Sequence, residues 1–222
     1  MNADLDNRRP LKSRDTSWAR AGAAWLARVG VTPDAVSAGA VVFGLVGGGL
    51  LAVSGVADGP LRVAALLAGA LCIQLRLVCN LMDGMVAVEH GRGGPLGPIW
   101  NELPDRIADG AFLVGAGYGA ALAGAGWGEA AGWAAAVFAV LTAYVRELGR
   151  ALGQPADFGG PMAKPQRMAL LTAAAIVTTF EHNWGWRGET FTGSLALIAI
   201  GAALTAAIRT GRLAARLKSG TS

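Results

Sequence analysis

Apolar residues gather in six segments along the chain, separated by shorter polar or glycine-rich stretches. Most of the segments approach the roughly 20 residues that a helix needs to cross the hydrocarbon core of a bilayer. The fifth is short, and the second contains Arg76. Six such segments in succession are more typical of a membrane bundle than of buried helices in a soluble protein. The pattern therefore predicts an all-α integral membrane protein of about six transmembrane helices, over residues 36–56, 61–82, 107–126, 130–149, 167–181 and 191–208.

A polar, basic arm precedes the first apolar segment. Within it, Trp18, Trp25 and Val29 recur on one helical face. This pattern predicts an amphipathic helix that lies on the membrane surface, and a solvated arm is the alternative. Further along, Thr32 and Pro33 are typical of a helix start, with threonine as the N-cap and proline at the first helical position.

The composition agrees with a membrane protein. Only 15% of the 222 residues are charged, whereas a soluble domain carries about 25%. The 33 glycines indicate closely packed membrane helices. Long apolar runs exclude a disordered chain. Cys72 and Cys79 lie in an apolar segment, so we expect two free thiols rather than a disulfide.

The positions of the basic residues predict the orientation. If both termini lie on one side, every lysine and arginine except Arg62 and Arg187 falls on that side, which should be cytoplasmic. We therefore expect a multi-pass protein of a bacterial inner membrane. Its expected partners include the lipid bilayer but no nucleic acid. The predicted parts are a cytoplasmic arm with the surface helix (1–35), the membrane domain (36–208) and a basic cytoplasmic tail (209–222).

An acidic stretch ends the second segment and begins the third. Asn80 and Asp83 are three residues apart at the end of a helix, so they face one way. Asn101, Asp105 and Asp109 are spaced by four and form one stripe, with Asn101 expected as a helix cap. The stretch holds five of the 15 carboxylates of the chain, namely Asp83, Glu89, Glu102, Asp105 and Asp109.

Two oxygen-rich helix faces would thus meet at the membrane boundary. Clustered carboxylates repel one another and are costly near lipid, and a divalent cation relieves both costs. Hard oxygen ligands suit Mg²⁺, Mn²⁺ or Ca²⁺ rather than zinc. The alternative is that these side chains are helix caps and solvated loop acids. The spacing favours a metal site.

The stretch resembles the signature of the CDP-alcohol phosphatidyltransferases. That signature is Asp-x2-Asp-Gly-x2-Ala-Arg, then eight or nine residues, then Gly-x3-Asp-x3-Asp. The spacing matches at every step, although the sequence has asparagine at two of the aspartate positions and valine in place of the arginine. The matching residues are Asn80, Asp83, Gly84, Ala87, Val88, Gly97, Asn101 and Asp105.

The resemblance implies residue roles. In the family, four aspartates hold a pair of divalent ions, Mg²⁺ or Mn²⁺, and the last aspartate is thought to deprotonate the acceptor alcohol. Carried over, Asp83 and Asp105 are metal ligands and Asp105 is also the general base, while Asn80 and Asn101 offer uncharged amide oxygens. Whether one or two ions bind stays open. From its place one turn beyond Asp105 on the same face, Asp109 is expected to contribute, and Glu89 and Glu102 are the other acids close in sequence.

Substrate contacts are expected on both halves of the site. Gly84 would let a nucleotide approach the backbone, although a glycine that only packs helices is an equal alternative. Ala87 and Gly97 are further candidate substrate-binding residues, because they match the signature. The connection between the fourth and fifth segments holds basic residues that predict either an anion pocket or ordinary positive-inside charge. Its candidate anion-binding residues are Arg146, Lys164 and Arg167.

The sequence thus predicts an enzyme that moves a phosphatidyl or phospho-alcohol group from a CDP-linked lipid to an alcohol acceptor and releases CMP. One alternative is an impaired relative that binds lipid or nucleotide without turnover. Another is a small ion transporter, but its cation site should lie near mid-bilayer. Glycine-rich faces, such as the one that carries Gly115 and Gly119, are compatible with a homodimer.

Overall fold

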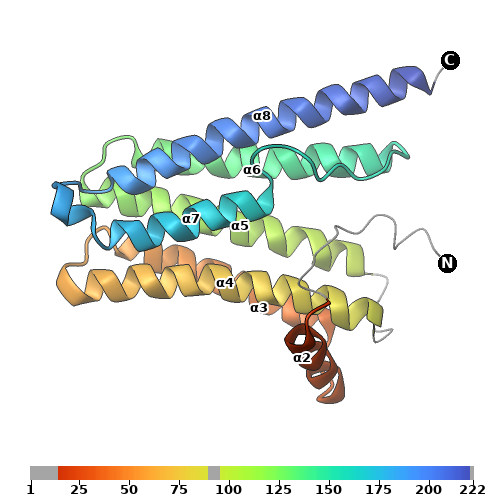
Figure 1. The fold of residues 1–222 in the computed structure, drawn as a ribbon, viewed down its shortest axis with the longest axis horizontal. Coiled ribbons are helices and arrows are strands. Elements are labelled where there is room, and N and C mark those ends of the chain that lie inside the picture. Colours follow the sequence, from red (N-terminus) through yellow and green to blue (C-terminus); the bar gives the residue numbers. More distant parts are fainter. Residues whose placement is uncertain (1–14, 90–95, 221–222) are drawn as a thin grey trace.

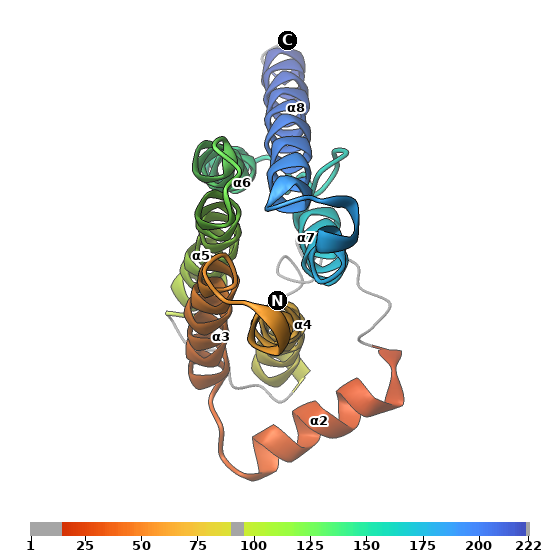
Figure 2. The same cartoon turned by 90° about the vertical axis from the view of Figure 1, so that its left-hand side faces the viewer.

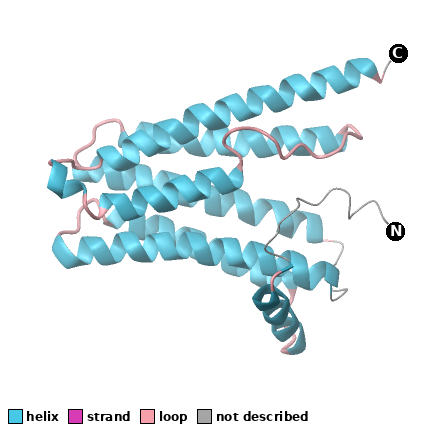
Figure 3. Ribbon diagram, in the orientation of Figure 1, coloured by secondary structure: helices cyan, strands magenta, loops and turns pink. Residues whose placement is uncertain are grey.

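The computed structural model describes residues 15–89 and 96–220, and in these ranges it is helical without any strand (Figures 1 and 3). The all-α prediction is therefore confirmed. A short 3₁₀ helix, η2 (Glu181–Trp184), lies between the last two α-helices. The α-helices are α2 (Ser17–Arg28), α3 (Pro33–Val53), α4 (Gly59–Glu89), α5 (Gly97–Ala123), α6 (Gly128–Ala151), α7 (Lys164–Thr178) and α8 (Glu189–Ser219).

The six apolar segments correspond to the six helices α3 to α8. Four of them, α3, α4, α6 and α8, are long and apolar enough to cross a membrane within the described residues. The helix α7 has only 15 residues, and α5 carries acidic and basic side chains in its first half. Length and composition thus support four crossings in the described part of the chain, and six crossings stay a prediction.

The helices form an elongated bundle in which α3 packs against both α4 and α5. Figure 2 shows α3, α5 and α6 in a row, with α4 and α7 on the other side and α8 beside α6. The helix α2, the end of α4, the start of α5 and the end of α8 lie at one end of the bundle, and η2 lies at the other (Figure 1). The residues of the signature are thus gathered at one end.

Local sequence explains how several helices begin. The Thr32 hydroxyl accepts a hydrogen bond from the Ala35 N–H (3.2 Å), and Pro33 is the first residue of α3, so this predicted start is confirmed. For α5 the prediction was wrong, because the helix begins at Gly97 rather than at Asn101. A proline in its first turn needs no N–H partner there.

Two helices continue beyond their apolar segments. The helix α4 runs to Glu89, and α8 runs to Ser219. Most of the predicted basic tail is therefore helical, because alanine, leucine, arginine and lysine all favour helix. In consequence Arg209, at the start of the predicted tail, is buried inside the bundle.

The predicted amphipathic helix is present as α2. Its small residues Ala19 and Ala23 are buried and pack beside Met82 and Met85 of α4. Trp18 and Trp25 remain about half exposed. A face with exposed tryptophans suits the polar–apolar boundary of a bilayer, and the position of α2 on the membrane stays a prediction.

Glycines allow α3 and α5 to approach closely. A Cβ atom on Gly48 would lie 2.7 Å from the carbonyl carbon of Ala111, and one on Gly115 would lie 2.7 Å from the Cα of Gly48. Gly119 likewise packs against the backbone of Leu51. Gly115 and Gly119 are therefore buried within the chain against α3, which corrects the expectation that they offer a face for a homodimer.

Neighbouring glycines of α3 provide a test of this packing. The change Gly48→Ala should lower the stability by about 1–3 kcal/mol, because the new methyl group meets the backbone of α5. The change Gly49→Ala should be neutral or stabilising by up to about 1 kcal/mol, because a Cβ there meets no atom within 4 Å. Thermal unfolding of the two variants in detergent, followed by tryptophan fluorescence, measures the difference. Equal midpoints would contradict the close packing of α3 on α5.

Candidate active site

The end of α4 presents Asp83 to the site. Its carboxylate accepts a hydrogen bond from the Ser37 hydroxyl of α3 (2.7 Å) and another from the Gly84 N–H (2.5 Å). The side chain is buried, and it forms no ion pair with any described residue. Asp83 therefore has a fixed orientation and a negative charge that no neighbouring cation contacts.

Asp105 lies where α4, α5 and α7 meet. Its carboxylate accepts a hydrogen bond from the Asn80 amide and forms an ion pair with the Lys164 ammonium. Guanidinium nitrogens of Arg76 and Arg106 lie 3.2 and 3.3 Å from its two oxygens. The structure thus brings together three of the predicted site residues: Asn80, Asp105 and Lys164.

Asp109 lies one turn deeper and is almost fully buried. One carboxylate oxygen pairs with Arg76, and the other lies 3.3 Å from Arg167. Arg167 also donates to the main-chain oxygen of Met162 (3.0 Å). Asp109 and Arg167, which were expected to bind metal and substrate respectively, are therefore partners in an ion pair beneath the site.

The remaining predicted residues lie around this cluster. Glu102 pairs with Arg146, and the Asn101 amide lies 3.5 Å from a Glu102 oxygen. Ala87 is half-buried, and a Cβ on Gly97 would meet no atom within 4 Å. Glu89 ends α4, but its side chain lies outside the described part of the structure.

The donors suit a hard divalent cation, but their charge is low. Asp83 and Asp105 interact electrostatically, and the Asn80 amide contacts Asp105 through its NH2 group, while Asn101 lies beside Glu102. Within residues 15–89 and 96–220, no three histidine, cysteine, aspartate or glutamate side chains gather as a metal site would require. Two carboxylates with amide oxygens fit one Mg²⁺ or Mn²⁺ ion better than two.

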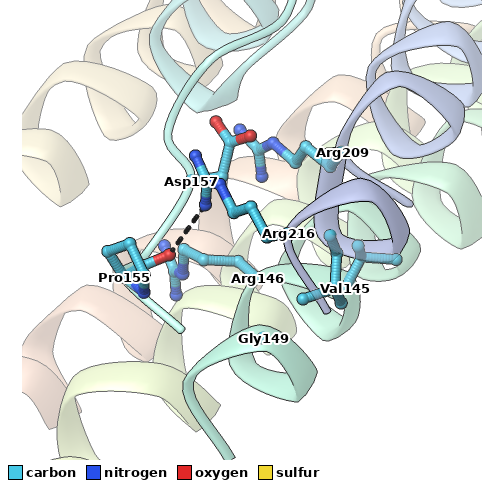
Figure 4. A pocket seen from close by; sticks show the side chains of 8 residues that line it. Val145, Arg146, Gly149, Pro155, Asp157, Arg209 and Arg216 are labelled. Carbon is cyan, nitrogen blue, oxygen red and sulfur yellow. Dashed lines mark hydrogen bonds between the residues drawn. The ribbon is translucent and has the colours of Figure 1, made fainter. Parts of the chain in front are cut away.

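A second basic group lines a small pocket between the end of α6 and α8 (Figure 4). Arg146, Arg209 and Arg216 lie around it, together with Asp157 of the loop that follows α6. Arg209 donates to the main-chain oxygens of Gly159 (2.9 Å) and Thr142 (2.7 Å), and Arg216 donates to that of Pro155 (3.4 Å), the bond drawn as a dashed line. A wider hollow of about 700 Å³ adjoins it at Pro155 and extends toward Pro98.

Asp157 stays ionised within this basic group. Burial raises the pKa of its carboxyl, but the Gly159 N–H and the guanidinium groups of Arg212 and Arg209 outweigh that effect, so its pKa lies below the ordinary value. The carboxylate therefore balances part of the arginine charge around the pocket, and Arg146 is also paired with Glu102 and Glu147.

Sequence reasoning missed three arginines of the site. Arg76 makes the second apolar segment a less secure membrane span, and its part in the site was not predicted. A cation in an apolar helix, one turn before Asn80, nevertheless indicates a functional site. Arg209 and Arg216 were assigned to a basic tail. Their position beside α6 depends on the continuation of α8, which the apolar pattern does not predict.

The long apolar helices, with the signature residues gathered at one end, agree with the predicted resemblance to the CDP-alcohol phosphatidyltransferases. No family model matches the chain. The chain is 29% identical over 161 residues to a phosphatidylinositol phosphate synthase of Mycobacteroides abscessus, which covers 68% of the chain and 64% of that protein. It is 28% identical over 156 residues to the corresponding synthase of Mycobacterium marinum, with 70% and 62% covered. The alignments thus span less than two thirds of these relatives.

Solved structures share the fold. The phosphatidylinositol phosphate synthase of Mycobacterium tuberculosis with CDP-DAG bound superposes with a TM-score of 0.73 at 23% identity, covering 89% of this chain and 94% of that one. The same protein in complex with manganese and citrate gives a TM-score of 0.69, with 88% of each chain covered. The predicted resemblance to the CDP-alcohol phosphatidyltransferases is therefore confirmed in sequence and in fold.

The buried ion pairs beneath the site can be tested by stability. Asp109→Asn should destabilise the protein by about 3–5 kcal/mol, because it removes the carboxylate that pairs with the buried Arg167 and one of the two that pair with the buried Arg76. The matched change Asp157→Asn, at a carboxylate whose partner Arg212 is half exposed, should cost about 1 kcal/mol or less. Thermal unfolding of both variants in the same detergent measures this contrast, and similar losses would show that Asp109 is not a structural counter-ion.

Proposed function

We propose that the chain is a membrane transferase that moves a phosphatidyl or phospho-alcohol group from a CDP-alcohol to a hydroxyl acceptor, with release of CMP. The observation that carries this proposal is the meeting of Asp83 of α4 with Asp105 of α5, beside Lys164, at one end of the bundle. Relatives named phosphatidylinositol phosphate synthase, and a neighbour of the same fold with CDP-DAG bound, support it.

The proposed setting is a bacterial inner membrane that is crossed six times. The end of α4 and the start of α5, which carry the site, lie at the end of the bundle that also holds α2 and the end of α8 (Figure 1). Arg62 near the start of α4 pairs with Glu181 of η2, which lies at the other end. An excess of basic residues marks the cytoplasmic side. Substrate would therefore bind at the cytoplasmic face, where a nucleotide head stays in water while its lipid tail stays in the bilayer.

The proposed cofactor is Mg²⁺ or Mn²⁺, and the related fold that contains manganese supports this choice. Asp83 and Asp105 would hold the ion, with amide oxygens of Asn80 and Asn101 as further ligands. Asp109 remains a candidate only if it gives up one of its arginine partners. When bound, such an ion neutralises a diphosphate and stabilises the leaving CMP.

The side chains of the site can position the phosphates and accept a proton. In the reaction, the acceptor oxygen bonds to the phosphorus of the transferred group, the bond from that phosphorus to CMP breaks, and Asp105 takes the hydroxyl proton. In the structure Lys164 pairs with Asp105. A substrate phosphate competes for that ammonium, and the loss of the cation makes the carboxylate a stronger base. Gly84, Ala87 and Gly97 lie at the positions proposed to contact the nucleotide.

The proposed acceptor is a phosphorylated alcohol. The pocket lined by Arg146, Arg209 and Arg216 gathers three guanidinium groups at the same end of the bundle. Guanidinium groups are well suited to phosphate oxygens. The names of the relatives point to an inositol phosphate, and the polyanion citrate bound to the M. tuberculosis protein is consistent with an anion site in this fold.

One set of observations favours the alternative of a binder without turnover. Asn80 and Asn101 lack the charge of aspartate, and the Asp105 carboxylate is already contacted by three cations. Such a protein would still hold a CDP-lipid through its basic side chains.

CMP release by the purified protein in lipid separates the two functions. We expect release from CDP-diacylglycerol with Mg²⁺ or Mn²⁺ and an acceptor chosen among inositol phosphate, inositol and glycerol phosphate, and loss of release with a chelator. Asp105→Asn should lower the rate at least about 100-fold, because the proton acceptor is lost. The matched change Asp58→Asn, at an exposed residue before α4, should leave the rate unchanged. Binding of the CDP-lipid without release under any condition would establish the binder instead.

The acceptor pocket has its own kinetic test. Arg216→Ala should raise the KM for a phosphorylated acceptor by about 10-fold or more, because a charge-assisted hydrogen bond contributes roughly 1.5–3 kcal/mol, while the kcat changes little. Lys218→Ala, two residues further along the same helix, is the control. An equal rise in KM for phosphorylated and unphosphorylated acceptors would show that the pocket does not bind the acceptor phosphate.

A further inference from the structure

Arg76 places a buried positive charge among the proposed metal ligands. It lies in α4 one turn before Asn80, and its side chain is fully buried. Its guanidinium donates to the main-chain oxygen of Asp105 (3.1 Å), lies 3.2 Å from a carboxylate oxygen of the same residue and pairs with Asp109. A single fixed cation therefore bridges two successive turns of the carboxylate stripe on α5.

Positive charge is already abundant on α5. The carboxylates of Asp105 and Asp109 together contact four cationic side chains, which are Arg76, Arg106, Lys164 and Arg167. Asp83 is the carboxylate of the site without an ion pair in the described residues. Because like charges repel strongly in a buried site, this cluster attracts one divalent ion near Asp83 far better than it attracts two.

We propose that the Arg76 guanidinium takes the place of a second divalent cation, so that the site binds one metal ion per chain, between Asp83 and Asp105. This inference rests on the proposed function, because it concerns the metal of the same site. It also accounts for the asparagines: with a fixed cation in place, Asn80 and Asn101 need not carry the negative charge that a second ion requires.

The unpaired nitrogens of Arg76 support this role. Its Nε and Nη1 atoms are buried and have no hydrogen-bond partner among the described residues. A buried donor without a partner costs free energy, and a phosphate oxygen of the substrate would satisfy it. The guanidinium can thus hold a substrate oxygen, as a metal ion with an open coordination position does.

The direct test counts Mn²⁺ ions on the purified full-length protein. Elemental analysis after removal of free metal should give about one Mn²⁺ per chain, and electron paramagnetic resonance should show an isolated ion without the coupling that two ions roughly 3.5–4 Å apart produce. Two ions per chain with a coupled signal would overturn the proposal, and so would the absence of any bound Mn²⁺.

Variants of the same position sharpen the count. Asn80→Asp combined with Asn101→Asp should still bind one ion while Arg76 is present, and the further change Arg76→Leu should admit a second. Arg76→Lys keeps the positive charge, so this variant should still bind one ion. Arg150→Leu, made in the same double variant, is the control for the removal of an arginine elsewhere. A second ion in the presence of Arg76, or none gained after its removal in a folded variant, would overturn the proposal.

The number of bound metal ions tests the role of Arg76, and the CMP assay tests the proposed function, so each proposal can be contradicted without the other. One bound ion without CMP release would contradict the proposed function and support the role of Arg76. CMP release with two bound ions would support the function and overturn the role of Arg76. If Arg76→Leu does not fold, the wild-type count and the Arg76→Lys count still decide the question.

Discussion

The buried pairing of Asp109 with Arg76 and Arg167 is the constraint on which the rest of the site depends. It ties α5 to α4 on one side and to α7 on the other, and α4 and α5 otherwise meet mainly through α3. An ion pair in an apolar bundle is stable only when each charge is compensated. Asp109 therefore fixes the position of Arg76, and Arg76 in turn contacts Asp105 above it.

The chemistry of the site follows from this arrangement. Asp105 is held between fixed cations, whereas Asp83 is held by neutral donors from Ser37 and Gly84. The two carboxylates thus differ in environment although they lie close together. In the proposed function, Asp83 holds a metal ion, and Asp105 has cationic partners that a substrate phosphate would draw away. This division of roles is what a transfer of a phosphorylated group at a membrane surface requires.

The sequence predicted the helices well, because they depend on local periodicity. That the two motif-bearing helix faces lie together was inferred from the positions of their polar residues and from the resemblance to the family signature, and the hydrogen bond between Asn80 and Asp105 agrees with it. Apolar runs located the six long helices, and Thr32 with Pro33 located one helix start. The start of α5 was misplaced because Pro98 and Pro104 both suit a first turn, and only the structure shows which is used. The ion pairs of Arg76 and Arg167 with Asp109 could not be predicted, since they join residues about 30 and 60 positions apart, and no local pattern specifies such a distance.

The most direct test of this account is a structure of the protein in lipid with Mn²⁺ and CDP-diacylglycerol, with anomalous scattering used to locate manganese. The account predicts a single manganese peak between Asp83 and Asp105, with the diphosphate beside Lys164 and Arg76 still paired with Asp109. Manganese elsewhere in the bundle, or two peaks within the site, would contradict it.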